Sequence, residues 1–159
     1  MSDYYIGIDF GTSFSSFSAF KDGELQIIPD CFGEKLHQSC ITFNEKDIFF
    51  GNLSKKLLSL YINSSIYNIL QLIGKNYKDK YIEEKKKYWP FKLLEDTNNN
   101  RYKISININN EEKEFTIEEI LGLIFINIRN ICSNYLKVEI KDVVVSIPSC
   151  FNNFSKTNH

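Results

Sequence analysis

The sequence predicts an α/β half-domain in which an antiparallel meander and a later buried strand form one mixed sheet packed against helices. Three observations support this prediction. Short apolar runs separated by turn residues fill the first 28 residues, a stripe of isoleucines at helical spacing follows Thr116, and an unbroken run of valines comes after that stripe. A long helical segment between strands is typical of a crossover connection within one sheet.

The first element is a predicted β-hairpin over residues 5–20. Two apolar runs flank the polar turn Gly11-Thr12-Ser13, and Asp9 stands near the end of the first run. Glycine frees the turn backbone, and N–H groups outside the ladder can converge with the two hydroxyls on an anion. A carboxylate beside phosphate needs a cation between them, and magnesium is often held through one or two carboxylates while keeping its waters. The turn therefore indicates half of a Mg-nucleotide site, with a plain hairpin and Asp9 as a turn former as the alternative.

Turn and periodicity signals predict the next elements. Lys21-Asp22-Gly23 leads into a third strand that ends at Pro29, and residues 41–50 form a second hairpin. Gly51 opens a helix that is broken at residues 63–65. The helical spacing of four apolar residues then predicts a short helix that stops at Gly74; these residues are Ile66, Ile69, Leu70 and Ile73.

The second half of the chain has clearer signals. Residues 81–88 are charged and predict a solvated helix with a Glu83–Lys87 pair, and residues 91–115 alternate as strands do. The capping box at residues 116–119 begins the longest helix, which runs to Tyr135. The valine run at 143–145 predicts a central strand buried on both faces.

Composition limits the possible functions. The chain has 159 residues, enough for one domain, and its net charge of -1 with no basic stripe argues against nucleic acid as a partner. No secretory segment and no apolar run of membrane length is visible, which predicts a soluble, cytoplasmic chain without membrane partners. The four cysteines are widely spaced and predict mostly buried, reduced thiols and no zinc site; they are Cys31, Cys40, Cys132 and Cys150.

Several segments resemble one family. Gly7 to Ser13 is similar to Gly-Ile-Asp-Leu-Gly-Thr-Thr, the first phosphate motif of the 70-kDa heat-shock chaperones, within the actin and sugar-kinase superfamily. Further segments follow in the family's order and span the chain: Ile27 to Asp30 with Gly33, Leu72 to Gly74, Trp89 to Phe91, and Val145 to Pro148 with Phe151-Asn152. Trp-Pro-Phe and the last segment are more specific to the chaperones than the phosphate turn is.

The resemblance implies the first lobe of an actin-like ATPase (ribonuclease H-like) nucleotide-binding domain. Residues 1–37 and 115–159 would form a sheet-and-helix subdomain, and residues 38–114 an inserted smaller one. ATP or ADP with Mg would bind weakly, because the family's opposing phosphate turn and adenosine pocket come later in its sequence than the part that this chain resembles. The family's peptide-binding groove comes later still, so a truncated chain would have no such groove of its own. The phosphate would lie at Gly11, Thr12, Ser13 and Phe14, and Mg would be held by Asp9 through water.

One departure from the family bears on catalysis. Aligning Leu72 to Gly74 with the family's Arg-Leu-Ile-Gly places Leu70 where the family has the lysine that orients the attacking water, so no catalytic residue is intact. Losing one such group typically costs ~10²–10³ in rate. We therefore expect an ATP-binding chaperone relative, involved in protein folding and the stress response, with little hydrolysis of ATP to ADP and phosphate.

Two other readings of the resemblance stay open. The chain could be a non-enzymatic interaction or regulatory protein, such as a ribosome-associated atypical chaperone partner, or the product of a truncated gene. The expected partners are co-chaperones, or another chaperone chain that supplies the missing lobe.

Overall fold

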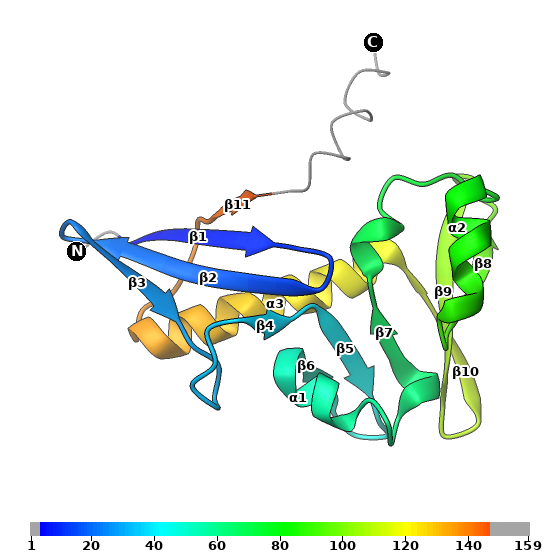
Figure 1. Cartoon of the computed structure of the whole chain (residues 1–159), viewed down its shortest axis with the longest axis horizontal. Coiled ribbons are helices and arrows are strands. Elements are labelled where there is room, and N and C mark those ends of the chain that lie inside the picture. Colours follow the sequence, from blue (N-terminus) through cyan, green and yellow to red (C-terminus); the bar gives the residue numbers. More distant parts are fainter. Residues whose placement is uncertain (1–3, 147–159) are drawn as a thin grey trace, which may run out of the picture.

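The computed structural model describes residues 4–146, which form a mixed sheet, two small antiparallel sheets and three α-helices (Figure 1). The strands are β1 (Tyr5–Phe10), β2 (Phe14–Lys21), β3 (Glu24–Ile28), β4 (His37–Gln38), β5 (Cys40–Phe43), β6 (Ile48–Phe50), β7 (Ser65–Tyr67), β8 (Lys92–Asp96), β9 (Arg101–Ile108), β10 (Glu111–Thr116) and β11 (Val144–Ser146). The helices are α1 (Gly51–Leu57), α2 (Lys80–Lys85) and α3 (Ile117–Leu136), with 3-10 turns at Ile62–Ser64, Ile69–Gln71 and Lys86–Tyr88.

The mixed sheet has the order β11-β1-β2-β3, and β4 pairs with the start of β2. Strands β1, β2 and β3 form the predicted antiparallel meander. The turn between β2 and β3 uses Asp22 and Gly23, both at positive φ, which these residue types adopt readily. Strand β11 returns parallel to β1 after the long helix, as a crossover connection requires. The predicted α/β fold with a mixed sheet is confirmed.

Helix α3 lies along one face of this sheet (Figure 1). Its start is fixed by the predicted capping box: Thr116 Oγ1 accepts the Glu119 N–H at 3.1 Å, and Glu119 Oε2 accepts the Thr116 N–H at 2.8 Å. Its buried residues recur every three or four positions and pack into the core, which confirms the predicted stripe; they are Ile117, Ile120, Ile124, Ile128 and Cys132.

The two small sheets lie between β4 and α3 in the sequence. One has the order β6-β5-β7, and the other has the order β10-β9-β8. Strand β9 buries Tyr102, Ile104, Ile106 and Ile108 as its alternation predicts. The division of the chain into residues 1–37 with 115–159 and an inserted 38–114 stays a prediction.

The predicted short helix up to Gly74 is wrong. Ser65–Tyr67 is strand β7, which pairs with β5, and only Ile69–Gln71 forms a 3-10 turn. Asn68 separates the two with a left-handed backbone at φ 58°. A short apolar run fits either a strand or a helix, and here the open edge of β5 decided in favour of a strand.

The prediction that residues 143–145 form a central strand buried on both faces is also wrong within the described residues. Strand β11 lies at the edge of the sheet, pairs only with β1, and leaves Val144 74% exposed. An apolar run shows only that a strand is compatible with burial on both faces. Whether it is buried depends on the elements that pack against it.

The predicted pair between Glu83 and Lys87 is replaced by a pair between Glu83 and Lys86. Helix α2 ends at Lys85 and continues as a 3-10 turn, in which side chains three positions apart are aligned.

The described cysteines are free thiols, as predicted: Cys40 and Cys132 are buried, and Cys31 is exposed. Burial raises the pKa of Cys40 and raises that of Cys132 to about 11, so both thiols stay protonated near neutral pH. Cys150 lies outside the described residues. None of the helices within 4–146 combines the length and hydropathy that a bilayer span requires.

Candidate functional site

The predicted phosphate turn joins β1 to β2. The Gly11 N–H donates to the Phe14 carbonyl at 3.1 Å and closes the turn. A Cβ added to Gly11 would lie 2.4 Å from that carbonyl oxygen, closer than any real contact. Gly11 is not among the residues with positive φ, so the turn needs glycine for this close approach and not for an unusual backbone angle.

Ser39 holds the turn from the neighbouring segment. Its hydroxyl donates to the Gly11 carbonyl at 2.7 Å, and its N–H donates to the Ser13 carbonyl at 2.9 Å. The Ser15 hydroxyl lies 2.9 Å from the Ser39 hydroxyl, and both side chains are buried. Sequence reasoning missed Ser39, because no motif or spacing links it to a turn that lies more than twenty positions earlier.

Two N–H groups of the turn remain available to a ligand. Within residues 4–146, those of Thr12 and Ser13 donate to no protein acceptor. Ser13 is exposed and Thr12 is partly exposed, so both are accessible. Phe14, also predicted at the phosphate, starts β2 with its carbonyl engaged by Gly11. Because residues 5–20 contain no Lys or Arg, an anion here would rely on N–H and hydroxyl donors.

Asp9 lies near the end of β1 with its side chain on the outer, exposed face of the sheet. Its Oδ1 accepts the hydroxyl of Ser146 at 2.6 Å, across the β1–β11 pair. The carboxylate is exposed, so it can also accept hydrogen bonds from the waters of a hydrated cation. The described residues contain no cluster of three or more His, Cys, Asp or Glu side chains, so a cation at Asp9 would need most of its ligands from water and phosphate.

Leu70 stands where the family resemblance expects a lysine, and it lies in the hydrophobic core at 3% exposure. It therefore offers no polar group to a phosphate or a water. At this position the side chain contributes to the packing of the core.

A second polar cluster stabilises the loop after β3. The Asp30 carboxylate accepts the Phe32 and Glu34 N–H groups at 2.8 and 2.9 Å, and the Asn52 amide at 2.8 Å. Burial raises the pKa of Asp30, but these hydrogen bonds outweigh burial and hold the pKa below its usual range.

Acidification is expected to remove the stabilisation that ionised Asp30 provides. Because the pKa of Asp30 is lowered by folding, its contribution is fully present above the unfolded pKa of about 3.9 and is lost as the pH falls through the folded value. The difference in free energy of unfolding between the wild type and Asp30→Asn should therefore shrink below about pH 4. Urea titrations of both proteins at several pH values measure this difference in free energy of unfolding. A difference that stays constant down to about pH 3 would contradict this account.

Comparison with known proteins identifies the family. The profile described as Hsp70 protein matches residues 5–158, nearly the whole chain. The chain belongs to the Hsp70 family. The predicted resemblance is thereby confirmed, and with it the actin-like fold class.

Curated Hsp70 proteins show the same similarity. Heat shock 70 kDa protein 2 of Paracoccidioides lutzii is 29% identical over 147 residues, which cover 92% of this chain and 22% of that protein. Heat shock cognate 70 kDa protein 3 of Dictyostelium discoideum is 26% identical, with 92% and 23% covered. The heat shock protein 70 homolog of Acanthamoeba polyphaga mimivirus is 31% identical, with 92% and 16% covered. The chain thus spans about a fifth of the length of the first two of these relatives and less of the third.

Proposed function

We propose that this chain supplies one phosphate- and magnesium-binding side of the nucleotide cleft of an Hsp70-type chaperone involved in protein folding. The observation that supports this most directly is the pair of free N–H groups at Thr12 and Ser13 next to the exposed Asp9 carboxylate. Free N–H donors on the turn that follows an exposed carboxylate suit a phosphate with a bound cation and disfavour a free anion.

In this proposal each residue has a distinct task. The Thr12 and Ser13 N–H groups donate to phosphate oxygens, and Gly11 keeps the turn tight enough to aim them. Asp9 accepts hydrogen bonds from magnesium-bound waters, and Ser146 fixes the carboxylate's orientation. Magnesium would neutralise phosphate charge that Asp9 would otherwise repel.

Replacing Asp9 by asparagine should weaken Mg-ATP binding and remove its magnesium dependence. We expect wild-type binding in the high micromolar range or weaker. A dissociation constant near 1 mM corresponds to a binding free energy of ~4 kcal/mol, which is what we expect from a solvent-exposed phosphate site. Asparagine keeps the shape and an acceptor for Ser146 but loses the charge. Titration calorimetry with and without Mg²⁺ measures the effect.

Asp22→Asn is the matched control, because Asp22 is an exposed aspartate in the turn at the other end of β2. It should leave binding unchanged. Equal binding by wild type and Asp9→Asn would mean that the turn is only a hairpin, and submicromolar wild-type binding would show that the site is more complete than proposed.

The burial of Leu70 favours a second candidate function, that of a nucleotide-responsive interaction or regulatory protein without hydrolysis. An ATPase needs a preorganised polar group near the γ-phosphate, and a core leucine cannot act as one. A colorimetric assay of phosphate release under saturating Mg-ATP separates the two candidates. Steady turnover in the wild type that is lost in Asp9→Asn would exclude the second candidate.

The proposed partner is another chaperone chain that covers the outer face of the sheet. Tyr5, Phe20 and Leu25 are direct cross-strand neighbours on this face and are 69%, 43% and 64% exposed. Adjacent exposed apolar side chains of this size are typical of surfaces that associate.

We expect this chain to self-associate at tens of micromolar when no partner is present. Sedimentation velocity measures the association, and Phe20→Ser with Leu25→Ser should reduce it, because these changes remove most of the exposed apolar row. A wild-type chain that sediments as a monomer at these concentrations would contradict the partner proposal.

A further inference from the structure

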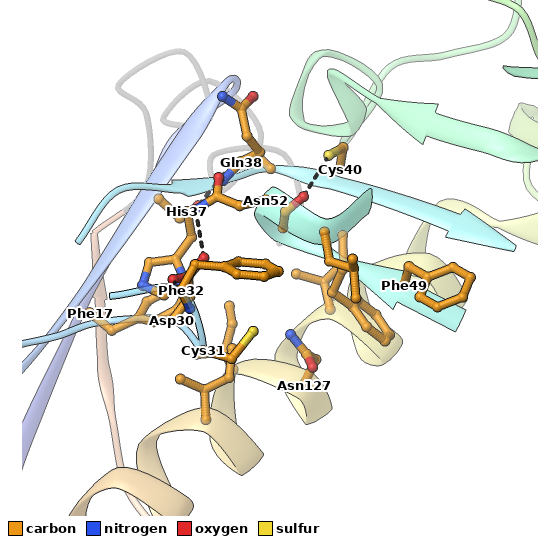
Figure 2. A pocket seen from close by; sticks show the side chains of 18 of the residues that line it. Phe17, Asp30, Cys31, Phe32, His37, Gln38, Cys40, Phe49, Asn52 and Asn127 are labelled. Carbon is orange, nitrogen blue, oxygen red and sulfur yellow. Dashed lines mark hydrogen bonds between the residues drawn. The ribbon is translucent and has the colours of Figure 1, made fainter. Parts of the chain in front are cut away.

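A cavity of about 230 Å³ lies between the start of β2, the loop after β3, α1 and α3 (Figure 2). Its walls include Ser15 and Ser39, but Asp9, Thr12 and Ser13 do not line it. The cavity therefore adjoins the turn through Ser15 and Ser39, but none of the residues proposed to contact phosphate or magnesium lines it.

The lining is dominated by aromatic and aliphatic side chains. Five phenylalanines line it together with aliphatic residues of α1 and α3. The phenylalanines are Phe10, Phe17, Phe32, Phe49 and Phe50, and Leu53 and Ile131 are two of the aliphatic residues. A dry cavity of ~150 Å³ with such a lining can bind benzene. The present cavity is larger and is partly open to solvent, and its volume accommodates one aromatic ring with a substituent.

Most polar groups of the lining are already engaged. Asp30 accepts three hydrogen bonds, His37 Nε2 lies 3.1 Å from the Ile28 carbonyl, and the Cys40 thiol donates to the Gly51 carbonyl at 3.3 Å. Asn127 differs from these residues. Its amide extends from α3 toward the cavity, and Figure 2 shows no hydrogen bond between it and the other lining residues drawn.

We propose that this cavity is a binding site for a small aromatic molecule that carries one hydroxyl or ring N–H group. The ring packs among the phenylalanines, and the polar group bonds the Asn127 amide, which can both donate and accept. A purely apolar ring would make no hydrogen bond to this amide, and the described lining contains no Lys or Arg that could pair with an anionic ligand.

Phenol and toluene are suitable probes, because they share a ring and differ in the hydroxyl group. In ¹H–¹⁵N spectra of the full chain, phenol should shift the amides of lining residues such as Ser15 and Asn52 saturably, with a dissociation constant of about 1 mM or tighter. In Asn127→Leu, which keeps the side-chain size, phenol should bind about tenfold more weakly and toluene as tightly as before or more tightly.

Ile131→Phe provides a second, independent variant, because it adds volume to the cavity from a partly exposed position on α3. It should abolish binding of both probes. The proposal is overturned if phenol produces no saturable shift in the wild type, if its affinity survives Asn127→Leu, or if both probes still bind to Ile131→Phe. No nucleotide enters this experiment, so its outcome is independent of the proposed nucleotide site.

Discussion

Ile120→Asp is expected to abolish the cooperative folding of the chain. Ile120 is 0% exposed and belongs to the first part of the α3 stripe that packs in the core. An aspartate there would be an unpaired charge in apolar surroundings, or would take up a proton at a comparable cost. A buried charge without a partner typically costs 3–5 kcal/mol, a large part of the ~5–15 kcal/mol that stabilises a domain.

The matched control is Ile126→Asp, the same change on the same helix at a residue that is 53% exposed. It should cost less than about 1 kcal/mol, as surface substitutions usually do. Urea unfolding followed by circular dichroism measures both variants. Equal losses in the two would show that the α3 stripe is not the core of the chain.

Gly11→Ala is expected to abolish Mg-ATP binding and to destabilise the fold. The new Cβ would lie 2.4 Å from the Phe14 carbonyl oxygen, so the turn must open and the Gly11 N–H bond to that oxygen must break. Overpacking of this kind typically costs 1–3 kcal/mol. The Thr12 and Ser13 N–H groups would then lose the tight turn that holds them, and calorimetry should detect no binding.

Gly122→Ala is the control for this change. Gly122 lies within α3, and a Cβ there would meet nothing within 4 Å. Alanine should stabilise the helix by roughly 0.5–1 kcal/mol and leave nucleotide binding unchanged. If Gly11→Ala behaves like Gly122→Ala in both measurements, the steric account of the turn is wrong.

The best sequence predictions concern elements that are stabilised locally. The β1–β2–β3 meander was predictable because a turn signal and apolar alternation both act between neighbouring residues. The start of α3 at Thr116 was predictable for the same reason, because a capping box lies within four residues. Strand β7 was missed because its pairing with β5 involves residues about 25 positions apart.

The candidate site divides in the same way. Asp9 and the Gly11-Thr12-Ser13 turn were visible in the sequence, because one short segment contains both the carboxylate and the donors. Ser39, which clamps the turn, and Ser146, which bonds Asp9, come from distant segments. Only the pairing of β1 with β11 and of β2 with β4 brings them there.

By itself, the sequence determined the meander, the long helix and the candidate phosphate turn, since each rests on residue types within one short stretch, and it determined the family through several such stretches. The tertiary structure alone decided that Gly11 is required by a 2.4 Å approach, that Leu70 belongs to the core, and that β11 lies at an exposed edge. Burial and close approach depend on what the rest of the chain places beside a residue, and local patterns do not contain that information.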